Sequence, residues 1–288
     1  MEQKKSSSPG KICAALGKSL LYLLFYLGVH LLVGAVYFVA LMGHLAITYG
    51  EMEPDQLVQL FLQRFIAGAD TLSLISLAIV AGGLLLWFLI RRKSLGKAAG
   101  IQRCSSWTVG FCLFAAVGLY IIVSLMISLL PAAWLADYDE AMSPAKYTSL
   151  ISVLFSVIAA PVVEELVFRG IIQSRLEQAM SAWVAVLIQA ALFGVIHGQP
   201  LQISYAFVLG LIFGWIRYCS QSILPTVAAH MAFNAMNLPT VTLNGIVNEW
   251  YILGGMVVVC TVGCLLCRRG WAQLLAGPAR EEEDAPLE

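Results

Sequence analysis

The sequence consists largely of long apolar runs, and these restrict the folds that the chain can adopt. The runs extend over 20–42, 71–90, 108–130, 149–172, 182–196, 203–216, 223–238 and 250–267. The first four and the last are long enough to cross the roughly 30 Å hydrocarbon core of a bilayer, because a helix rises about 1.5 Å per residue. We therefore expect an all-α polytopic membrane protein with about eight transmembrane helices.

The composition agrees with a lipid environment. Of the 288 residues, 60% are hydrophobic and 12% are charged, and the mean hydropathy is +0.83. Soluble domains contain about 25% charged residues, so this chain lies outside their range. The formal net charge is zero and says little about partners. We expect contact with the lipid bilayer and no nucleic acid among the partners.

The basic residues predict how the helices are oriented. With eight crossings both termini lie on one side, and the predicted inside segments hold fourteen basic residues against two, Arg64 and Lys146, in the outside loops. Cytoplasmic loops carry an excess of lysine and arginine, so both termini are predicted to be cytoplasmic. The first run is too long for a cleaved signal sequence and is expected to act as an anchor. A multi-pass protein of the bacterial cytoplasmic membrane follows as the expected localisation.

Five segments are predicted along the chain. The fifth, sixth and seventh apolar runs are short and contain polar side chains, whereas the first three contain no comparable polar group. The segments are a cytoplasmic N-terminal segment (1–18), three transmembrane helices that act as scaffold or gate (19–148), a helical catalytic core (149–240), a last transmembrane helix (241–270) and an acidic disordered tail (271–288). The tail combines acidic residues and prolines without apolar periodicity, which is typical of disorder.

Three charged residues interrupt the fourth apolar run, in the stretch VVEELVFRGII. If left unpaired at mid-membrane, Glu164, Glu165 and Arg169 would together cost about 8 to 10 kcal/mol of insertion free energy. Glu165 and Arg169 are four residues apart, so they lie on one helix face and are expected to form a buried ion pair. Glu164 lies about 100° around the helix and needs another partner. Pro161 removes one helical hydrogen bond nearby and predicts a local kink.

Two interpretations of Glu164 remain open from these residues alone. In the structural one, it hydrogen-bonds neighbouring helices and the charges stabilise only the fold. In the functional one, it faces a cavity and takes part in chemistry, as intramembrane carboxylates usually do.

Residue spacing predicts which polar groups meet Glu164. A turn near Met180 lies sixteen residues after Glu164 and seventeen before His197, so two antiparallel helices would bring both to one depth. His230 lies ten residues beyond a second turn near Ser220, and Asn234 follows one helical turn later on the same face. We therefore expect all four side chains to converge in a pocket open toward the cytoplasm.

This set of residues is compatible with two chemistries. Glu164, His197 and His230 suit a Zn²⁺ ion with an open coordination position. Alternatively, Glu164 acts as a base that activates water while histidine and asparagine hold an oxyanion. Asn234 favours the second, because asparagine is a poor zinc ligand and a good oxyanion donor.

Other catalytic patterns are not evident. The sequence has no His-Glu-x-x-His or Gly-x-Ser-x-Gly motif and no aspartate within an expected span, which argues against zincin, serine and aspartyl mechanisms. Cys264 and Cys267 lack the second pair of a zinc site and are expected to pack only. His30 and His44 are interpreted as structural.

Three short motifs follow one another late in this chain. They are EELVFR (Glu164, Glu165, Arg169), FGVIH (Phe193, His197) and HMAFN (His230, Asn234). Together they resemble the motifs of the CPBP intramembrane proteases, also called the CAAX prenyl protease 2 or Abi family. The resemblance covers 149–238, and its specificity comes from the three motifs together.

The resemblance implies peptide-bond hydrolysis within the membrane. Glu164 and His197 would activate water, while His230 and Asn234 would support the oxyanion. Glu165, Arg169 and Phe193 would hold the geometry of the site. No cofactor is required in this preferred mechanism, although Zn²⁺ stays an alternative because the family is often labelled as metalloproteases.

The substrate is expected to be a membrane-embedded or lipid-anchored peptide or protein, with prenylated ends as one type. Two other functions use the same residues. One is a proton-coupled transporter, which would show substrate flux without cleavage. The other is a catalytically idle immunity or anchoring protein that only binds a partner.

Overall fold

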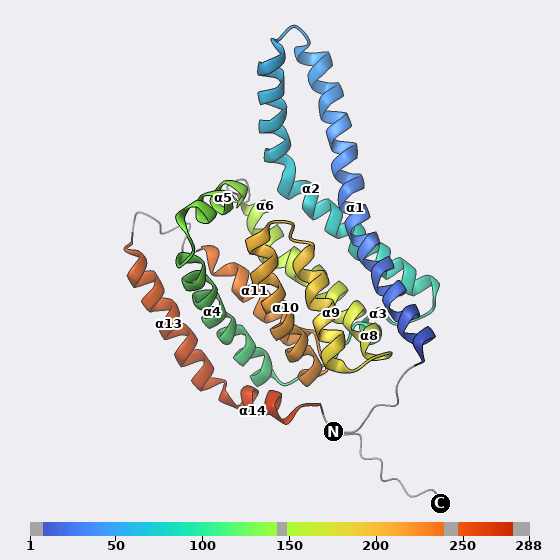
Figure 1. Ribbon diagram of the computed structural model, residues 1–288, viewed down its shortest axis with the longest axis vertical. Helices are drawn as coiled ribbons and strands as arrows, with labels where there is room; N and C mark the ends of the chain where they lie inside the picture. Colours follow the sequence, from blue (N-terminus) through green and yellow to red (C-terminus); the bar gives the residue numbers. More distant parts are fainter. Residues whose placement is uncertain (1–7, 143–148, 239–246, 279–288) are drawn as a thin grey trace, which may run out of the picture.

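Residues 8–142, 149–238 and 247–278 are described by the computed structural model, and within them the chain forms helices and no strand (Figure 1). The chain is an all-α polytopic membrane protein, as the apolar runs predict. In chain order the elements are α1 (Pro9–Tyr49), α2 (Pro54–Ile90), α3 (Leu95–Ala98), α4 (Ser106–Ser128), α5 (Ala132–Met142), α6 (Leu150–Val153), η2 (Leu154–Ala159), α7 (Ala160–Glu165), η3 (Leu166–Gln173), α8 (Ser174–Glu177), α9 (Ala182–Val195), α10 (Pro200–Ser220), α11 (Leu224–Ala235), α13 (Glu249–Leu266) and α14 (Arg268–Ala276).

All eight apolar runs lie in helices, but not all of these helices have the length of a membrane span. Five stretches are long and apolar enough, namely α1, α2, α4, the continuous segment Leu150–Glu177 and α10. The bent pair α13 and α14, with 64° between Trp250–Leu266 and Arg268–Ala276, brings the total in the described residues to six. The helix α9 is apolar but short, with 14 residues. The count of eight crossings stays a prediction.

The first two helices extend well beyond the expected runs. The helix α1 has 41 residues and α2 has 37, so α1 alone is about 60 Å long, twice the thickness of the hydrocarbon core. They form a hairpin whose outer half projects from the rest of the molecule (Figure 1). Because α2 begins at Pro54, Asp70 lies inside a helix that also includes an apolar span, contrary to the expectation that no span holds an aspartate.

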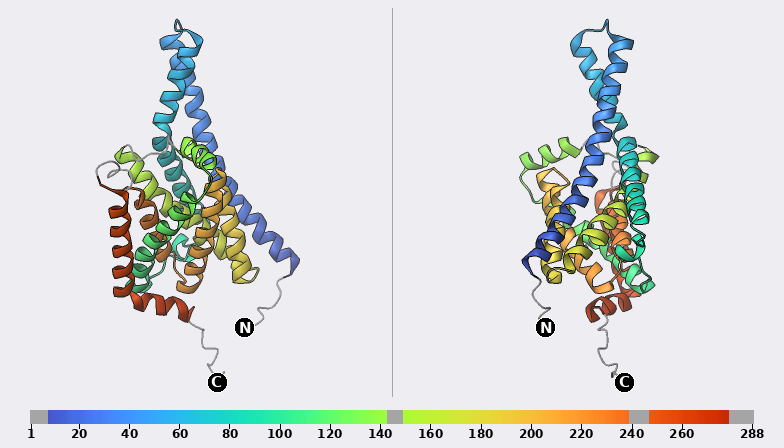
Figure 2. Two further views of the ribbon diagram at one scale, coloured as in Figure 1. Left: turned by 60° about the vertical axis from the view of Figure 1, so that its left-hand side comes forward. Right: turned by 90° about the vertical axis from the view of Figure 1, so that its right-hand side faces the viewer.

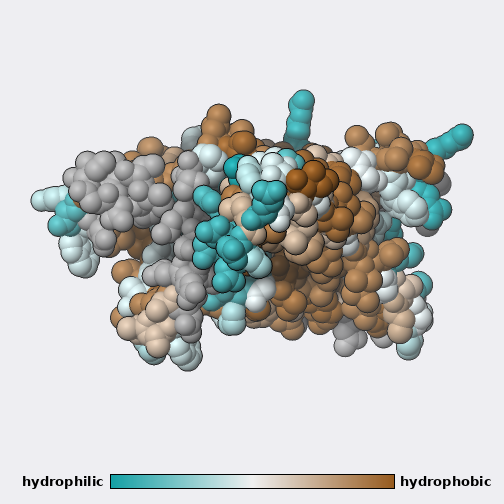
Figure 3. All heavy atoms as spheres, turned by 90° about the horizontal axis from the view of Figure 1, so that it is seen from above, coloured by the Kyte–Doolittle hydropathy of each residue, from teal (hydrophilic) through white to brown (hydrophobic). Residues whose placement is uncertain are grey.

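The remaining helices form the body of the molecule. In it α4 packs against α11, α13 and α14, and α9 packs against α10. The surface of the molecule is apolar over large areas, and Figure 3, which looks down on the end with the hairpin, shows hydrophobic residues along much of the flank. Exposed leucine, valine and isoleucine on α1, α2, α4 and α13 account for this, as expected for helices that face lipid.

The ends of the body helices follow from local sequence. Proline occupies the first turn of α10 and α11, where its missing N–H costs no hydrogen bond. The Gln199 side chain caps α10 by accepting from the Gln202 N–H, and Gln221, with φ of 54°, ends the same helix in the left-handed conformation. These turns near 178–181 and 221–223 lie where the sequence places them.

The segment Leu150–Glu177 carries the first motif and departs from regular α geometry in two places. Its π-helical stretches η2 and η3 flank α7, which contains Pro161 near its start. Pro161 therefore does not break the helix, and the wider turns of η2 precede it. Such π-helical turns are often found at functional sites.

The first part of the predicted C-terminal tail is helical. Residues 271–276, assigned to a disordered tail (271–288), belong to α14. Trp271 lies 5.5 Å from the Phe111 ring and 6.1 Å from the Trp215 ring, and Leu274 is buried in the same cluster. This apolar packing explains why the helix continues. The rest of the predicted tail lies largely outside the described residues.

The two described chain ends agree with an even number of crossings. The start of α1 and the end of α14 lie at the same end of the molecule, opposite the tip of the hairpin (Figure 2). The side of the membrane on which this end lies stays a prediction from the basic residues.

Candidate active site

The predicted ion pair between Glu165 and Arg169 is present and lies in the centre of the body. The Arg169 Nη1 donates to Glu165 Oε1 at 2.8 Å, and both side chains are 0% exposed. The Arg169 guanidinium also lies over the Phe193 ring, 4.1 Å from its centroid, and 5.4 Å from that of Phe213. A buried charge of this kind is stable only with such partners, so the pair fixes η3 against α9 and α10.

His230 lies between the two glutamates of the first motif. Its Nδ1 is 3.0 Å from Glu165 Oε1, and its Nε2 is 3.8 Å from Glu164 Oε2. An ionised carboxylate accepts hydrogen bonds, so Nδ1 carries the proton in this arrangement and Nε2 is directed toward Glu164. Glu164 is more accessible than Glu165, with 13% of its side chain exposed. The two adjacent glutamates therefore have different environments, one enclosed and one accessible.

Asn234 lies one helical turn after His230 on α11. Its Nδ2 donates to the Ser156 carbonyl of η2 at 2.8 Å. This hydrogen bond fixes the orientation of the side-chain amide and joins α11 to the segment that carries the glutamates. Asn234 is therefore held by the chain at the same end of α11 as His230.

His197 follows the end of α9 and does not contact Glu164 directly. Its Nδ1 donates to the Phe193 carbonyl at 2.8 Å, and its ring lies 4.9 Å from the Phe193 ring. Within the described residues no ion pair joins His197 to Glu164. The predicted direct meeting of His197 with Glu164 is therefore not seen, and His197 is connected instead to His230 through the Phe193 ring, which lies 5.8 Å from the His230 ring.

Phe193 is central to the site in a way that its motif position alone does not explain. It is buried, and its ring contacts Phe168, His197, His230 and Arg169. It therefore packs against the Arg169 guanidinium and against both imidazoles at once. The second and third motifs are packed together through this one aromatic ring.

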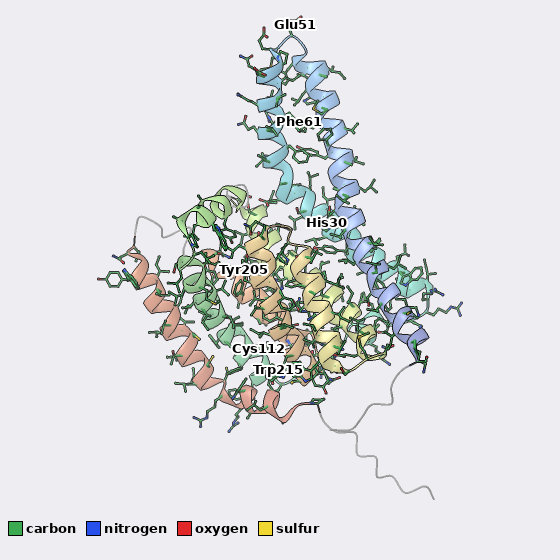
Figure 4. All side chains as sticks on the ribbon, in the orientation of Figure 1. His30, Glu51, Phe61, Cys112, Tyr205 and Trp215 are labelled. Atoms are coloured by element: carbon green, nitrogen blue, oxygen red, sulfur yellow. The ribbon has the colours of Figure 1, made fainter. Side chains whose placement is uncertain are left out.

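Sequence reasoning missed Tyr26, which α1 contributes to the site. Tyr26 is 6% exposed, its ring lies 6.1 Å from that of Phe168, and its side chain lies near that of Glu164. The His30 ring lies 4.7 Å from the Tyr26 ring and is tilted by 37° to it, and Figure 4 shows His30 where α1 crosses the body. The only signal in the sequence was the four-residue spacing of Tyr26 and His30 in an apolar helix, which predicts a shared face and no specific partner.

The arrangement of the two histidines bears on metal binding. Each uses Nδ1 for a protein acceptor, which is how histidine ligands are commonly oriented, and so leaves Nε2 for another partner. However, no three His, Cys, Asp or Glu side chains in the described part of the chain are grouped to hold one ion. Glu164, His197 and His230 are thus not assembled here as a zinc ligand set, and the same holds for Cys264 and Cys267. Use of Zn²⁺ by this site stays a prediction.

Comparisons with known proteins agree with the three motifs. Residues 146–236 match the family model described as type II CAAX prenyl endopeptidase Rce1-like. Over 84 residues the chain is 26% identical to the "Putative membrane peptidase YdiL" of Bacillus subtilis (strain 168). These 84 residues are 29% of this chain and 34% of that protein. The chain therefore aligns with only about a third of the length of this relative. No solved structure matches the chain.

The matched region contains every residue of the three motifs and ends just beyond Asn234, whereas Tyr26 lies outside it. The geometry and the match thus point to the same segment, η2 to α11. Residues 146–236 of the chain are thus similar to the Rce1-like endopeptidases, and this similarity agrees with the resemblance that the three motifs carry.

Proposed function

We propose that the chain is an intramembrane endopeptidase that hydrolyses a peptide bond of a membrane-embedded or lipid-anchored substrate, of which prenylated ends are one type. The observation that carries the proposal is the position of His230. Its imidazole lies 3.0 Å from Glu165 and 3.8 Å from Glu164, within the segment that matches the endopeptidase family.

In the proposed reaction Glu164 is the general base. Its carboxylate is partly accessible, so a water molecule can approach it and transfer a proton to it as the water oxygen attacks the substrate carbonyl. His197 orients this water through Nε2, since its Nδ1 is used by the Phe193 carbonyl. The proton held by Glu164 then passes to the leaving amine, which completes the hydrolysis.

The oxyanion that forms during attack is assigned to His230 and Asn234. Asn234 is oriented by its bond to Ser156, and amide donors of this kind stabilise oxyanions. His230 is assigned to donate to the oxyanion from Nε2, the ring nitrogen that its bond to Glu165 leaves available. Glu165 and Arg169 act through His230 as positioning residues.

The proposed reaction needs no metal ion. It uses the carboxylate as base and the imidazoles and amide as donors, all of which the chain supplies. If Zn²⁺ binds Glu164, His197 and His230 instead, removal of metal by exhaustive chelation will abolish activity and zinc will restore it. We expect activity to survive chelation.

A comparison of membrane peptides from cells with the wild-type chain and with Glu164→Ala tests the function across all membrane proteins at once, so no single substrate has to be chosen. We expect peptides with new ends that depend on Glu164. The two other functions give different results: a transporter changes flux across the membrane without new ends, and an idle binding protein changes neither. Identical peptide ends in both strains would contradict the proposed activity.

A further inference from the structure

A stripe of buried polar side chains runs from the candidate active site to the end of α8. Glu165, Arg169, Gln173 and Glu177 follow at four-residue intervals and so share one face of the segment. The first three are 0% exposed. Only Glu165 and Arg169 belong to a motif, so the stripe continues beyond the residues that the proposed mechanism uses.

Gln189 of α9 joins the stripe from the side. It is 0% exposed, and its Nε2 donates to the Gly210 carbonyl at 2.7 Å. Gln173 Nε2 donates to the Gly214 carbonyl at 2.9 Å and to Glu177 Oε1 at 2.8 Å. A Cβ atom on Gly214 would lie 2.5 Å from Gln189 Nε2 and 3.2 Å from Gln173 Oε1, so both amides meet at this glycine.

Several polar atoms in this region have no protein partner within the described residues. They are the donors Arg169 Nε and Nη2 and the acceptors Gln173 Oε1 and Gln189 Oε1. Each buried polar atom without a partner costs about 1 to 3 kcal/mol of folding free energy. Buried polar atoms in folded proteins are nearly always paired, either with protein or with internal water.

Rotation of the amides does not satisfy these atoms. Turning Gln173 by 180° would place its oxygen against Glu177 Oε1 and the Gly214 carbonyl, which are both acceptors. The same rotation of Gln189 would oppose two carbonyl oxygens at Gly210. The hydrogen bonds therefore fix both amide orientations, and the two oxygens need a donor from elsewhere.

We propose that water molecules bind between Arg169, Gln173 and Gln189 and form a hydrated polar path from the candidate active site to the end of α8. Water supplies donors to both amide oxygens and accepts from the Arg169 guanidinium, and an internal water with two to four such partners is stable. The stripe is thus a water-binding site that the proposed catalytic machinery does not include.

The far end of the path is accessible. Arg217 Nη2 donates to Ser174 Oγ at 2.7 Å, and Arg217 Nη1 lies 3.3 Å from Glu177 Oε2. The Glu177 side chain is 17% exposed, so solvent reaches this cluster. If the proposed function is correct, the path supplies the water that hydrolysis consumes; the hydration itself does not depend on that function.

X-ray hydroxyl-radical labelling of the purified full chain in lipid nanodiscs tests the proposal, because radicals from bound water oxidise the side chains beside it even where bulk solvent is excluded. Phe213 is the reporter, since it is 0% exposed and lies next to Gly214 and Arg169. Phe88 of α2, at 3% exposed, is the matched buried control. We expect Phe213 to be labelled several-fold faster than Phe88. Equal, slow labelling of the two rings would overturn the proposal.

Three variants refine this measurement. Gln173→Leu removes an acceptor of the path and is expected to slow labelling of Phe213 several-fold, while Gln59→Leu on the exposed part of α2 leaves it unchanged. Unchanged labelling of Phe213 in a folded Gln173→Leu protein would also count against the path. Glu164→Gln separates this inference from the proposed function: it should lose cleavage and keep the labelling of Phe213. Because the Phe213 ring also lies 5.6 Å from the His230 ring, water of the candidate active site could label it too, so a variant of the path is needed; if Gln173→Leu does not fold, Gln189→Leu, which removes the other amide oxygen, takes its place with the same expected result.

Discussion

Removal of Arg169 tests the structural role of the buried ion pair most sharply. In Arg169→Ala the buried carboxylate of Glu165 loses a hydrogen bond of 2.8 Å and its counter-charge. Breaking a buried pair by removing one partner costs about 3 to 5 kcal/mol of folding free energy, and loss of the contact with the Phe193 ring adds up to about 2 kcal/mol. The remaining bond to His230 limits the loss. We therefore expect about 3 to 5 kcal/mol, a large part of a typical domain stability.

The measurement is a denaturation titration: the protein is purified in a mild detergent, a denaturing detergent is added stepwise, and the fraction that stays folded is recorded. Glu164→Ala is the comparison. Glu164 is more accessible and lacks the ion pair, so its removal should cost much less than that of Arg169. A double-mutant cycle adds the decisive control. In the Glu165→Gln background, Arg169→Ala should cost less, because no carboxylate is then left without its counter-charge. An equal cost in both backgrounds, or equal losses for Arg169→Ala and Glu164→Ala, would refute the reasoning.

Three further predictions concern topology and the site. A reporter that works only in the cytoplasm should be active when it is fused after Glu288, because fourteen basic residues lie on the predicted inside and two outside. If instead a reporter that works only outside the membrane is active there, the result would contradict an even number of crossings with both termini inside. Tyr26→Phe should lower the cleavage rate about tenfold if the hydroxyl holds Glu164, as loss of a hydrogen bond to a charged group does, whereas Tyr22→Phe on the same helix should not. Asn234→Ala should lower the rate by about 10² to 10³ if it donates to the oxyanion; an unchanged rate would remove it from that role.

The sequence was sufficient for the parts of the site that depend on spacing within one helix. The pair of Glu165 and Arg169 follows from a four-residue interval and from the cost of burying charge, and it is confirmed. The turns near Met180 and Ser220 follow from local polar residues and are also confirmed. These features depend on short-range geometry, which the order of residues determines directly.

Features that depend on packing between distant segments were less predictable. The position of His230 between both glutamates requires the relative rotation of α7 and α11, and spacing gives depth but no rotation. His197 was expected to meet Glu164 directly, but its contact is with Phe193. Tyr26 was missed because a tyrosine in an apolar helix gives no charge signal.

The lengths of helices were also underestimated where polar residues occur within them. The outer parts of α1 and α2 continue past the apolar runs, and α2 includes Arg64 and Asp70. Hydropathy marks only the apolar part of a helix. The helices of the projecting hairpin continue beyond their apolar parts, so hydropathy underestimates their lengths. Similarly, α14 continues into the predicted tail because Leu274 is buried against the body.

The central claim is that Glu164 is the base of an intramembrane hydrolysis. The direct measurement is cleavage of a membrane peptide, identified from the Glu164-dependent ends, by purified wild-type protein and by Glu164→Gln after exhaustive chelation and metal analysis. Wild-type protein should cleave without metal, and Glu164→Gln should be folded, bind the peptide and leave it intact, because glutamine has the shape of the base and cannot accept the proton. Full cleavage by the folded Glu164→Gln protein would contradict the assignment of Glu164 as the base.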